Sequence, residues 1–407
     1  MGAYPSQSTT PERNEVTQLA PDFGSNVCID VCRSRYLLND MWCLDLFTLR
    51  WAEVQAGHAP PARKGHTLVA VGDSKWVLFG GTGAEDRLDD DTWIIDLQTD
   101  NRWWRLGCAA GGGSVGSPSA RKGHGAARVR VNGTDMMAVV GGENQAAEEQ
   151  ADMWLFEHAD FRVMQDGSTK ANASSLCRRE DGAMLHAAWH LVENYAEKLS
   201  PCSTWSNCDY YAAGRTRFVL AGSQSNVLVL SGGVTDYGAK ALNDVVHIVF
   251  SEAASEGGGY RIDPQWITLD GGFSGGRAHS AGACLASDIV LFGGAQRIWA
   301  STELSLTSNE AFRLSFPPCE SEATADSPVC VPCSPGFVVD NSTGSAVCTP
   351  CPIGTYSLFD GHANRCVDCP RGYEGFIIGA ASPDQCSPCP AFTRYVSSPT
   401  QAICHCL

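Results

Sequence analysis

The sequence has little positive charge for its length. Its 407 residues include 29 lysines and arginines against 45 aspartates and glutamates, which gives a formal net charge of −16. Nucleic-acid binding depends on clusters of Lys and Arg that neutralise backbone phosphates. We therefore exclude a nucleic acid as a partner.

Long apolar runs are absent as well. No stretch reaches the roughly 18 apolar residues of a membrane-spanning helix, and residues 1–25 show neither the apolar core nor the cleavage site of a secretory signal. We expect residues 1–26 to form a disordered N-terminal segment. No P-loop, dinucleotide-binding fingerprint or GxSxG elbow occurs, so the sequence offers no familiar catalytic motif.

Glycine is plentiful, and the composition is that of a folded chain. There are 42 glycines, 43% of residues are hydrophobic, and few stretches have helical periodicity. Such a composition favours β structure with many turns and a large core, divided among two or three domains.

One pentapeptide, ARKGH, occurs at residues 62–66 and again at 120–124. A histidine beside two cations could serve acid–base chemistry or hold a phosphate. Catalytic groups usually converge once, whereas a recurring segment marks a structural unit that stacks on its copies. We therefore assign His66 and His124 a structural role, and His279 with them.

Each copy precedes a series of short strands. Residues 67–71 and 76–79 form an apolar hairpin that ends in a Gly-Gly doublet, and residues 92–97 and 102–106 complete four strands. Gly-Gly doublets follow apolar strands four times, at residues 80, 141, 232 and 293. Glycine at such points allows close packing and backbone angles that other residues avoid.

This pattern resembles the kelch repeat, and the resemblance implies a β-propeller. We expect an all-β chain with a kelch-type propeller at residues 27–316, partial or of about five to six blades, and a C-terminal disulfide-rich repeat domain. The structural positions of the repeat are Arg63, His66, Gly80, Gly81, Trp93, Arg121, His124, Gly141, Gly142, Trp154, Gly232, Gly233, Arg277, His279, Gly293 and Gly294.

The match to the repeat is uneven. The third blade offers Arg215-Thr216-Arg217 in place of Arg-x-x-His, and the fourth shortens the motif to Arg277-Ala278-His279. Residues 39–46 and 50–51 resemble only the third and fourth strands of a blade, whereas residues 277–315 suggest four complete strands.

An insertion interrupts the repeat at about residues 167–214. Met184, Ala188, Leu191, Tyr195 and Leu199 share a stripe at helical spacing, so we expect a helix there that stops at Pro201. His186 and His190 have the spacing of two helical zinc ligands, but solvated or core-edge histidines are the more common case. Cys202 and Cys208 could close a small loop, with Cys177 as a third thiol nearby.

Two further kinds of metal site are conceivable from the sequence, for calcium and for copper. The acidic loop at residues 85–91 could hold calcium, but it lacks the spaced ligands of an EF-hand and reads better as a solvated loop. Some kelch-like propellers resemble galactose oxidase, a copper enzyme. The tyrosines, histidines and cysteine of such a site are not recognisable in this sequence, so we expect no cofactor and no enzyme activity, with a secreted copper oxidoreductase as the alternative.

Cysteines are concentrated at the C-terminus. Eleven of the 19 lie between Cys319 and Cys406, mostly as CxxC pairs about 18 residues apart. Disulfides in an oxidising compartment explain this better than zinc ribbons do, although CxxC pairs fit zinc as well. The candidates for disulfide bonding are Cys330, Cys333, Cys348, Cys351, Cys366, Cys369, Cys386, Cys389 and Cys404.

The run Cys351-Pro-Ile-Gly-Thr-Tyr-Ser357 resembles the cysteine-rich repeats of ephrin-receptor-like and tumour-necrosis-factor-receptor-like ectodomains, which implies such modules at residues 317–407. Sequons at Asn132, Asn172 and Asn341 are candidates for glycosylation. The layout is distantly similar to that of attractin-like proteins. We expect an extracellular or cell-surface binding protein whose propeller loops contact a protein or glycan ligand, with the cysteine-rich modules as a spacer or interaction stalk.

We also expect this chain to be part of a longer exported protein. That protein would add a signal peptide and further blades upstream and further cysteine modules downstream, with membrane anchoring through a segment outside these residues.

Overall fold

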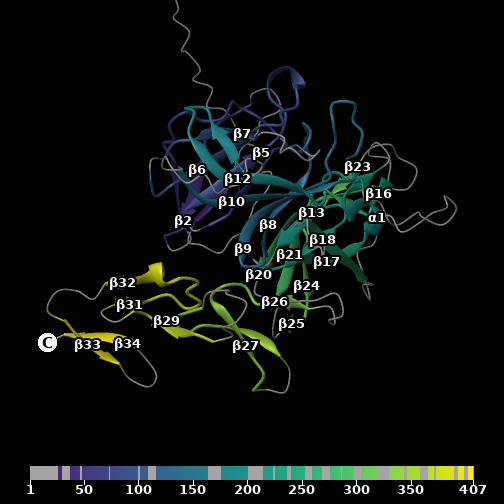
Figure 1. The fold of residues 1–407 in the computed structure, drawn as a ribbon. Coiled ribbons are helices and arrows are strands. Elements are labelled where there is room, and N and C mark those ends of the chain that lie inside the picture. Colours follow the sequence, from purple (N-terminus) through teal and green to yellow (C-terminus); the bar gives the residue numbers. More distant parts are fainter. Residues whose placement is uncertain are drawn as a thin grey trace, which may run out of the picture.

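The computed structural model is built almost wholly of short antiparallel strands (Figure 1). No helix among the described residues is long and apolar enough to cross a membrane. The structure describes residues 26–29, 37–45, 48–72, 74–99, 101–108, 116–163, 176–199, 214–222, 225–235, 240–252, 259–267, 276–285, 287–297, 304–319, 330–342, 346–357, 365–370, 373–388, 393–397 and 402–406.

Five groups of strands have the form of propeller blades, complete or partial. The first has three strands, in the order β1-β2-β3. The second, β4-β5-β6-β7, and the third, β8-β9-β10-β12, are joined edge to edge through β11 (Leu176–Arg179) into one nine-stranded sheet. The bounds are β1 Asn26–Ile29, β2 Trp42–Asp45, β3 Arg50–Glu53, β4 Thr67–Ala70, β5 Lys75–Phe79, β6 Thr92–Asp96, β7 Trp104–Cys108, β8 Gly125–Val131, β9 Thr134–Val140, β10 Met153–Val163 and β12 Met184–Leu191.

The fourth blade has four strands and the fifth has three. Their orders are β13-β14-β17-β18 and β20-β21-β24. Two small sheets, β15-β16 and β19-β22-β23, are formed by segments that lie between these strands in the sequence. The bounds are β13 Val219–Gly222, β14 Val227–Ser231, β15 Val234–Thr235, β16 Lys240–Ala241, β17 Val245–Glu252, β18 Tyr260–Ile267, β19 Arg277–Ala278, β20 Ala281–Leu285, β21 Asp288–Phe292, β22 Ala295–Arg297, β23 Leu304–Thr307 and β24 Ala311–Ser315.

The prediction of four strands at residues 277–315 was wrong for the described part of the fifth blade. Residues 304–307 form β23, which joins the small sheet, and β24 is the third strand of the blade. β24 ends at Ser315, and after Phe316 come Pro317 and Pro318, whose prolines cannot donate to a strand ladder. The chain therefore leaves the blade where a fourth strand would start.

The hydrophobic core lies between neighbouring blades. Along β5, Trp76 and Leu78 pack toward the first blade, whereas Val77 and Phe79 pack toward the third. This alternation follows from the two-residue period of a strand, which sends successive side chains to opposite faces. The first strands β4, β8, β13 and β20 contact one another in that order, so the blades stand side by side.

The helix predicted across the insertion was also wrong over most of its length. Residues 184–191 form β12, and the helix α1 covers only Tyr195–Leu199. Leu185, Ala187 and Trp189 point into the core between the second and third blades at a two-residue period. Pairing with β10 satisfies the backbone of this segment, so tertiary packing prevails over the apolar stripe at helical spacing.

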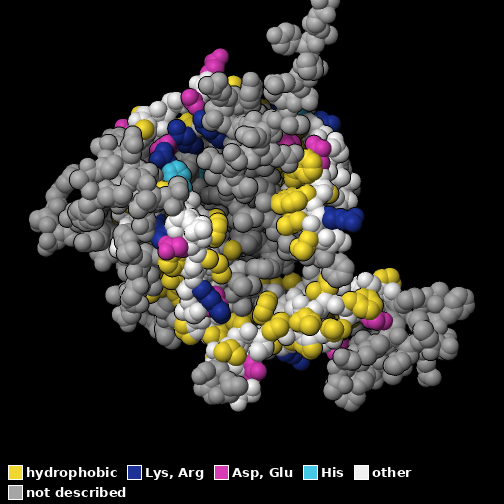
Figure 2. Space-filling model, turned by 180° about the vertical axis from the view of Figure 1, so that it is seen from behind, with side chains coloured by type: hydrophobic (Ala, Val, Ile, Leu, Met, Phe, Trp, Pro, Cys, Tyr) yellow, Lys and Arg dark blue, Asp and Glu magenta, His cyan; other side chains and the backbone are white. Residues whose placement is uncertain are grey.

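The cysteine-rich region continues from the fifth blade as a row of two-stranded units (Figure 1). Hydrophobic side chains gather on this part of the surface in Figure 2, and Ile353, Phe376 and Ile378 are among the exposed ones. The bounds are β25 Pro318–Cys319, β26 Val331–Pro332, β27 Phe337–Asp340, β28 Val347–Pro350, β29 Thr355–Tyr356, β30 Val367–Asp368, β31 Tyr373–Gly375, β32 Cys386–Pro388, β33 Thr393–Ser397 and β34 Ala402–Cys406.

Candidate functional site: an arginine hub at one end of the propeller

Four blades share an ion pair, with a buried arginine, just before their first strand. In the second blade, Arg63 donates two hydrogen bonds to Asp91, at 2.5 and 2.9 Å. The Arg63 side chain is almost fully buried, and a buried guanidinium is tolerated only when it is paired. The equivalent pairs are Arg121–Asp152, Arg215–Asp244 and Arg277–Glu310.

Each of these arginines also binds the end of the second strand. Arg63 Nη1 donates to the carbonyl oxygen of Gly80 at 3.0 Å, and Trp93 Nε1 donates to Asp91 at 2.6 Å. Burial alone would raise the pKa of Asp91, but the Arg63 hydrogen bonds and charge hold that pKa below its usual value. The Arg63 side chain thus links the start of β4 to the end of β5 and the start of β6. The carbonyls bound in the other blades are those of Gly141, Gly232 and Gly293.

A chain of backbone hydrogen bonds connects the blades two residues after each arginine. Gly123 N–H donates to Gly65 at 3.1 Å, Arg217 N–H to Gly123 at 2.8 Å, and His279 N–H to Arg217 at 2.9 Å. All four residues have a positive φ, which glycine adopts most easily. We call the ion pairs and this chain of hydrogen bonds the arginine hub.

The contacts of the second glycine in each Gly-Gly doublet show which residues are equivalent in the copies of the repeat. A Cβ on Gly81 would lie 2.8 Å from His66 Cβ, and one on Gly233 would lie 2.7 Å from Phe218 Cβ. A Cβ on Gly294 would meet Ser280 in the same way. The fourth motif is therefore not shortened: Ser280 takes the place of the histidine, and His279 takes the place of the glycine.

His124 is in a position that supports packing rather than proton transfer. Its Nε2 is hydrogen-bonded to Thr67 Oγ1 at 2.7 Å, and its ring packs edge-on against Phe79. Burial, together with the charges of Arg121 and His66, lowers the pKa of His124 to about 3. So low a pKa makes this imidazole a poor proton acceptor near neutral pH.

The loops on the hub side follow the second and fourth strands. The loops at 82–91 and 143–152 are linked, since Gln145 accepts from Leu88 N–H at 3.1 Å and donates to Asp86 O at 3.2 Å. Glu85, Asp86, Asp90 and Glu148 are exposed there. Among the described residues, no three His, Cys, Asp or Glu side chains are arranged to hold a metal ion.

The opposite side carries the hairpin turns between first and second strands. Asn132 and Gly133 form the two-residue turn between β8 and β9, both with positive φ, and Asn132 is exposed. Asn341 is exposed in the cysteine-rich region, and Asn172 lies outside the described residues.

The structure does not bring the two histidines of the insertion together as metal ligands. On a strand, His186 and His190 are separated by four residues, or about 13 Å. His190 instead pairs with Glu157 at 2.9 Å, which lowers the pKa of Glu157.

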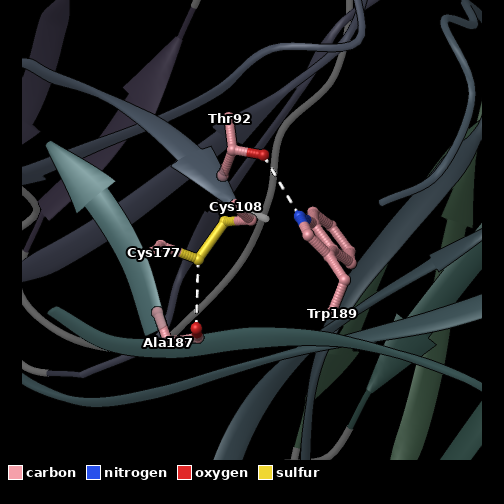
Figure 3. The surroundings of a disulfide bond; sticks show 5 residues. All are labelled: Thr92, Cys108, Cys177, Ala187 and Trp189. Atoms are coloured by element: carbon pink, nitrogen blue, oxygen red, sulfur yellow. Dashed lines mark hydrogen bonds between the residues drawn. A yellow bond between two sulfur atoms is a disulfide. The ribbon is translucent and has the colours of Figure 1, made fainter. Parts of the chain in front are cut away.

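A disulfide that the sequence did not suggest joins the second and third blades (Figure 3). Cys108 on β7 bonds to Cys177 on β11 (Leu176–Arg179), a strand that pairs with both β7 and β12. Nearby, Trp189 Nε1 donates to Thr92 Oγ1 at 3.2 Å, and Cys177 Sγ lies 3.0 Å from the Ala187 carbonyl. Cys177 is therefore not a third thiol beside Cys202 and Cys208, and those two cysteines lie outside the described residues. Separated by 69 residues, Cys108 and Cys177 gave no spacing signal.

The disulfides of the cysteine-rich region link successive CxxC pairs. The second cysteine of each pair bonds to the first cysteine of the next, and Cys389 lies outside the described residues. In chain order the bonds are Cys319–Cys330, in which Cys319 belongs to no CxxC pair, then Cys333–Cys348, Cys351–Cys366 and Cys369–Cys386.

The first of these disulfides lies inside the propeller core. Cys319, Cys330 and Val331 pack with side chains of the fourth and fifth blades. The buried His247 on β17 is hydrogen-bonded through Nε2 to the Cys330 carbonyl at 2.6 Å, and burial lowers its pKa. The cysteine-rich region is therefore attached to the propeller by packing as well as by the chain.

Fold and hub together define a kelch-type β-propeller followed by disulfide-rich modules. Comparison with known families agrees: residues 31–185 match the KLHDC2/KLHL20/DRC7 Kelch-repeats domain, and residues 338–386 match the tyrosine-protein kinase ephrin type A/B receptor-like family. The chain thus contains kelch repeats and an ephrin-receptor-like cysteine-rich region.

Several curated proteins share the kelch segment. The chain is 30% identical over 145 residues to F-box/kelch-repeat protein At1g51550 of Arabidopsis thaliana, covering 34% of this chain and 29% of that protein. It is 32% identical over 112 residues to Acyl-CoA-binding domain-containing protein 5 of the same plant (28% and 16%). It is 38% identical over 71 residues to Kelch domain-containing protein 1 of Mus musculus (17% and 17%).

The matched segment spans less than a third of each of these relatives. Among solved structures, that of YjhT matches with a TM-score of 0.43 and 13% identity, over 74% of this chain and 81% of the other. Kelch and ephrin-receptor-like modules together indicate a role in protein interaction.

Proposed function

We propose that this chain is a non-enzymatic binding protein of the cell exterior. The observation that carries the proposal is the arginine hub, which fixes the strand ends while the loops at 82–91 and 143–152 project from them. A rigid scaffold with variable loops is the usual design of a binding face.

The charge of these loops favours a basic protein partner over a neutral glycan. Glu85, Asp86, Asp90 and Glu148 are exposed on the hub side, and the exposed cations beside them include Arg87 and Lys64, whose Nζ lies 3.2 Å from Asp86 Oδ1. Complementary charge speeds encounter and sets specificity between proteins.

The cysteine-rich region fits the same role. Four described disulfides support placement in an oxidising, extracellular compartment. Exposed Phe376 and Ile378 give the region apolar contact surface, and we propose that it serves as spacer or stalk. Anchoring to a membrane would depend on a segment outside these residues.

A test compares two variants with the same change in charge. E85Q/D86N/D90N/E148Q neutralises the hub side, whereas D368N/D384N/E193Q/E197Q neutralises exposed carboxylates elsewhere. Saturable binding of the labelled chain to the surface of living cells should weaken at least tenfold in the first variant only. An equal loss of binding in both variants, or no loss in either, would contradict the assignment of the hub side as the binding face. Copper in the purified protein together with oxidase activity would contradict the non-enzymatic role.

A further inference from the structure

One buried histidine lies where the propeller meets the cysteine-rich region. His247 is almost fully buried on β17, and its neighbours on the same face of that strand, Val245 and Val249, belong to the cluster that contains Cys330. The imidazole also lies beside the ring of Phe316, with the ring centroids 6.4 Å apart. This side chain of the fourth blade therefore reaches the point at which the cysteine-rich region begins.

The hydrogen bonding of His247 fixes its neutral form. Nε2 lies 2.6 Å from the Cys330 carbonyl oxygen, which can only accept, so Nε2 carries the hydrogen. The other nitrogen, Nδ1, is buried and has no hydrogen-bond partner in the described part of the chain. A second proton on this ring would place an unpaired N–H and a positive charge inside an apolar cluster, and both are costly to bury.

The charged side chains on the strands around His247 do not offset this cost. β13, β14 and β20 have none, residues 316–319 and 330–334 are uncharged, and Gln265 lies opposite His247 on β18. Asp288 and Arg313 alternate with residues that face the cluster, so they lie on the other face of the fifth blade. The charged groups of the surrounding elements are Glu252, Arg261, Asp263 paired with Lys198, Asp288 with Arg313, and Glu310 with Arg277, while Glu320, Glu322 and Asp326 lie outside the described residues.

Detachment of the cysteine-rich region would change the surroundings of the imidazole. It would take away the Cys330 carbonyl and the apolar cover of Cys319 and Val331, so that water could solvate both ring nitrogens. Burial lowers the pKa of His247 in the attached state, whereas an exposed histidine keeps a pKa of about 6.5. The detached state thus binds the extra proton at a higher pH. As the pH falls below 6.5, the ratio of detached to attached molecules rises by up to about tenfold for each unit, until the attached state is protonated as well.

We propose that protonation of His247 releases the cysteine-rich region from the propeller. The junction is closed at neutral pH and opens at about pH 5–6, where histidine switches act in endosomes. The released region stays joined through the chain, but its first disulfide no longer packs with the fourth and fifth blades. This switch goes beyond the proposed function and does not depend on which partner the hub side binds.

The rate at which a phosphine reductant opens Cys319–Cys330 tests the proposal in the full chain. This disulfide is buried in the junction, and Cys369–Cys386, farther along the cysteine-rich region, is the internal reference. The ratio of the two initial rates should rise about tenfold from pH 7.5 to pH 5.5. In H247Q the ratio should stay nearly constant, because a glutamine amide can donate to the Cys330 carbonyl but takes up no proton. All 11 tryptophans precede residue 317, so tryptophan fluorescence checks that the propeller stays folded.

His158 provides a matched control away from the junction. It is also buried, its Nε2 lies 3.2 Å from the Val71 carbonyl oxygen, and burial lowers its pKa. H158Q should keep the tenfold rise of the original chain. A ratio that does not change with pH in the original chain, or that rises equally in H247Q, would overturn the proposal. Should H247Q fail to fold, the ratio must begin to rise near pH 6.5 in both the original chain and H158Q, and its loss in H158Q would show that His158 is the responsible group.

Discussion

At the scale of single residues, the repeat is held by arginine more than by histidine. Arg63 and its equivalents bind an acid and a glycine carbonyl in four blades. The histidine position accepts Phe218 or Ser280 in its place. Spacing alone revealed the arginines in the sequence, but it did not reveal their acids, because Asp91 lies 28 residues away across a loop.

The buried His124 makes stability depend on pH in a definite direction. Its pKa is about 3 when folded against an ordinary 6.5 when unfolded, so the unfolded chain binds the extra proton between these values. Stability is complete above pH 6.5 and falls as pH drops through this window. From pH 7 to pH 5 the original chain should lose about 2 kcal/mol more than H124Q in urea unfolding. Parallel pH profiles for the two proteins would show that His124 protonates freely in the fold.

At the scale of elements, the Gly-Gly doublets hold the blades at close approach. Gly81 has φ +97° and its hypothetical Cβ meets His66 Cβ and the Lys64 carbonyl within 2.9 Å. Turning a side chain cannot relieve these contacts, because His66 Cβ is fixed to the backbone and the Lys64 carbonyl is part of it.

A pair of glycine substitutions separates crowding from backbone conformation. Gly133 also has a positive φ, but a Cβ there meets nothing within 4 Å. We expect G133A to cost about 1–2 kcal/mol from φ alone, and G81A to cost about 1–3 kcal/mol more through overlap. The measurement is urea unfolding of each variant. Equal costs for the two would show that the doublet does not serve close packing.

The sequence predicted the elements with strong local signals and missed those set by distant contacts. The hairpins of the second and third blades follow from apolar alternation and turn residues. β12 was mistaken for a helix because Leu185, Ala187 and Trp189 gain their burial from another blade. The bond between Cys108 and Cys177 depends on β11 lying beside β7, which no local pattern encodes.

At the scale of the whole molecule, the packing of the propeller extends past the point where the cysteine-rich region begins in the sequence. A division at residue 317 was predicted from cysteine density. Cys319, Cys330 and Val331 nevertheless pack in the core of the fourth and fifth blades. The propeller and the first disulfide of the tail therefore form one packed unit.

Removing that disulfide should weaken the propeller itself. C319S/C330S releases a loop of 11 residues and loosens a buried cluster, which we expect to cost about 2–3 kcal/mol in propeller stability. The matched control C369S/C386S lies farther along the tail and should leave the tryptophan-monitored transition in place. If both double variants melt like the original chain, the cysteine-rich region does not stabilise the propeller and is joined to it by the chain alone.

We propose that the propeller and the cysteine-rich region are both oxidised, as a binding protein outside the cell would be. Peptide mapping by mass spectrometry, under non-reducing conditions with thiols alkylated, tests it most directly on protein purified from an exporting host. We expect linked peptides for Cys108–Cys177, Cys333–Cys348, Cys351–Cys366 and Cys369–Cys386. Alkylated cysteines at these positions together with stoichiometric zinc would contradict it.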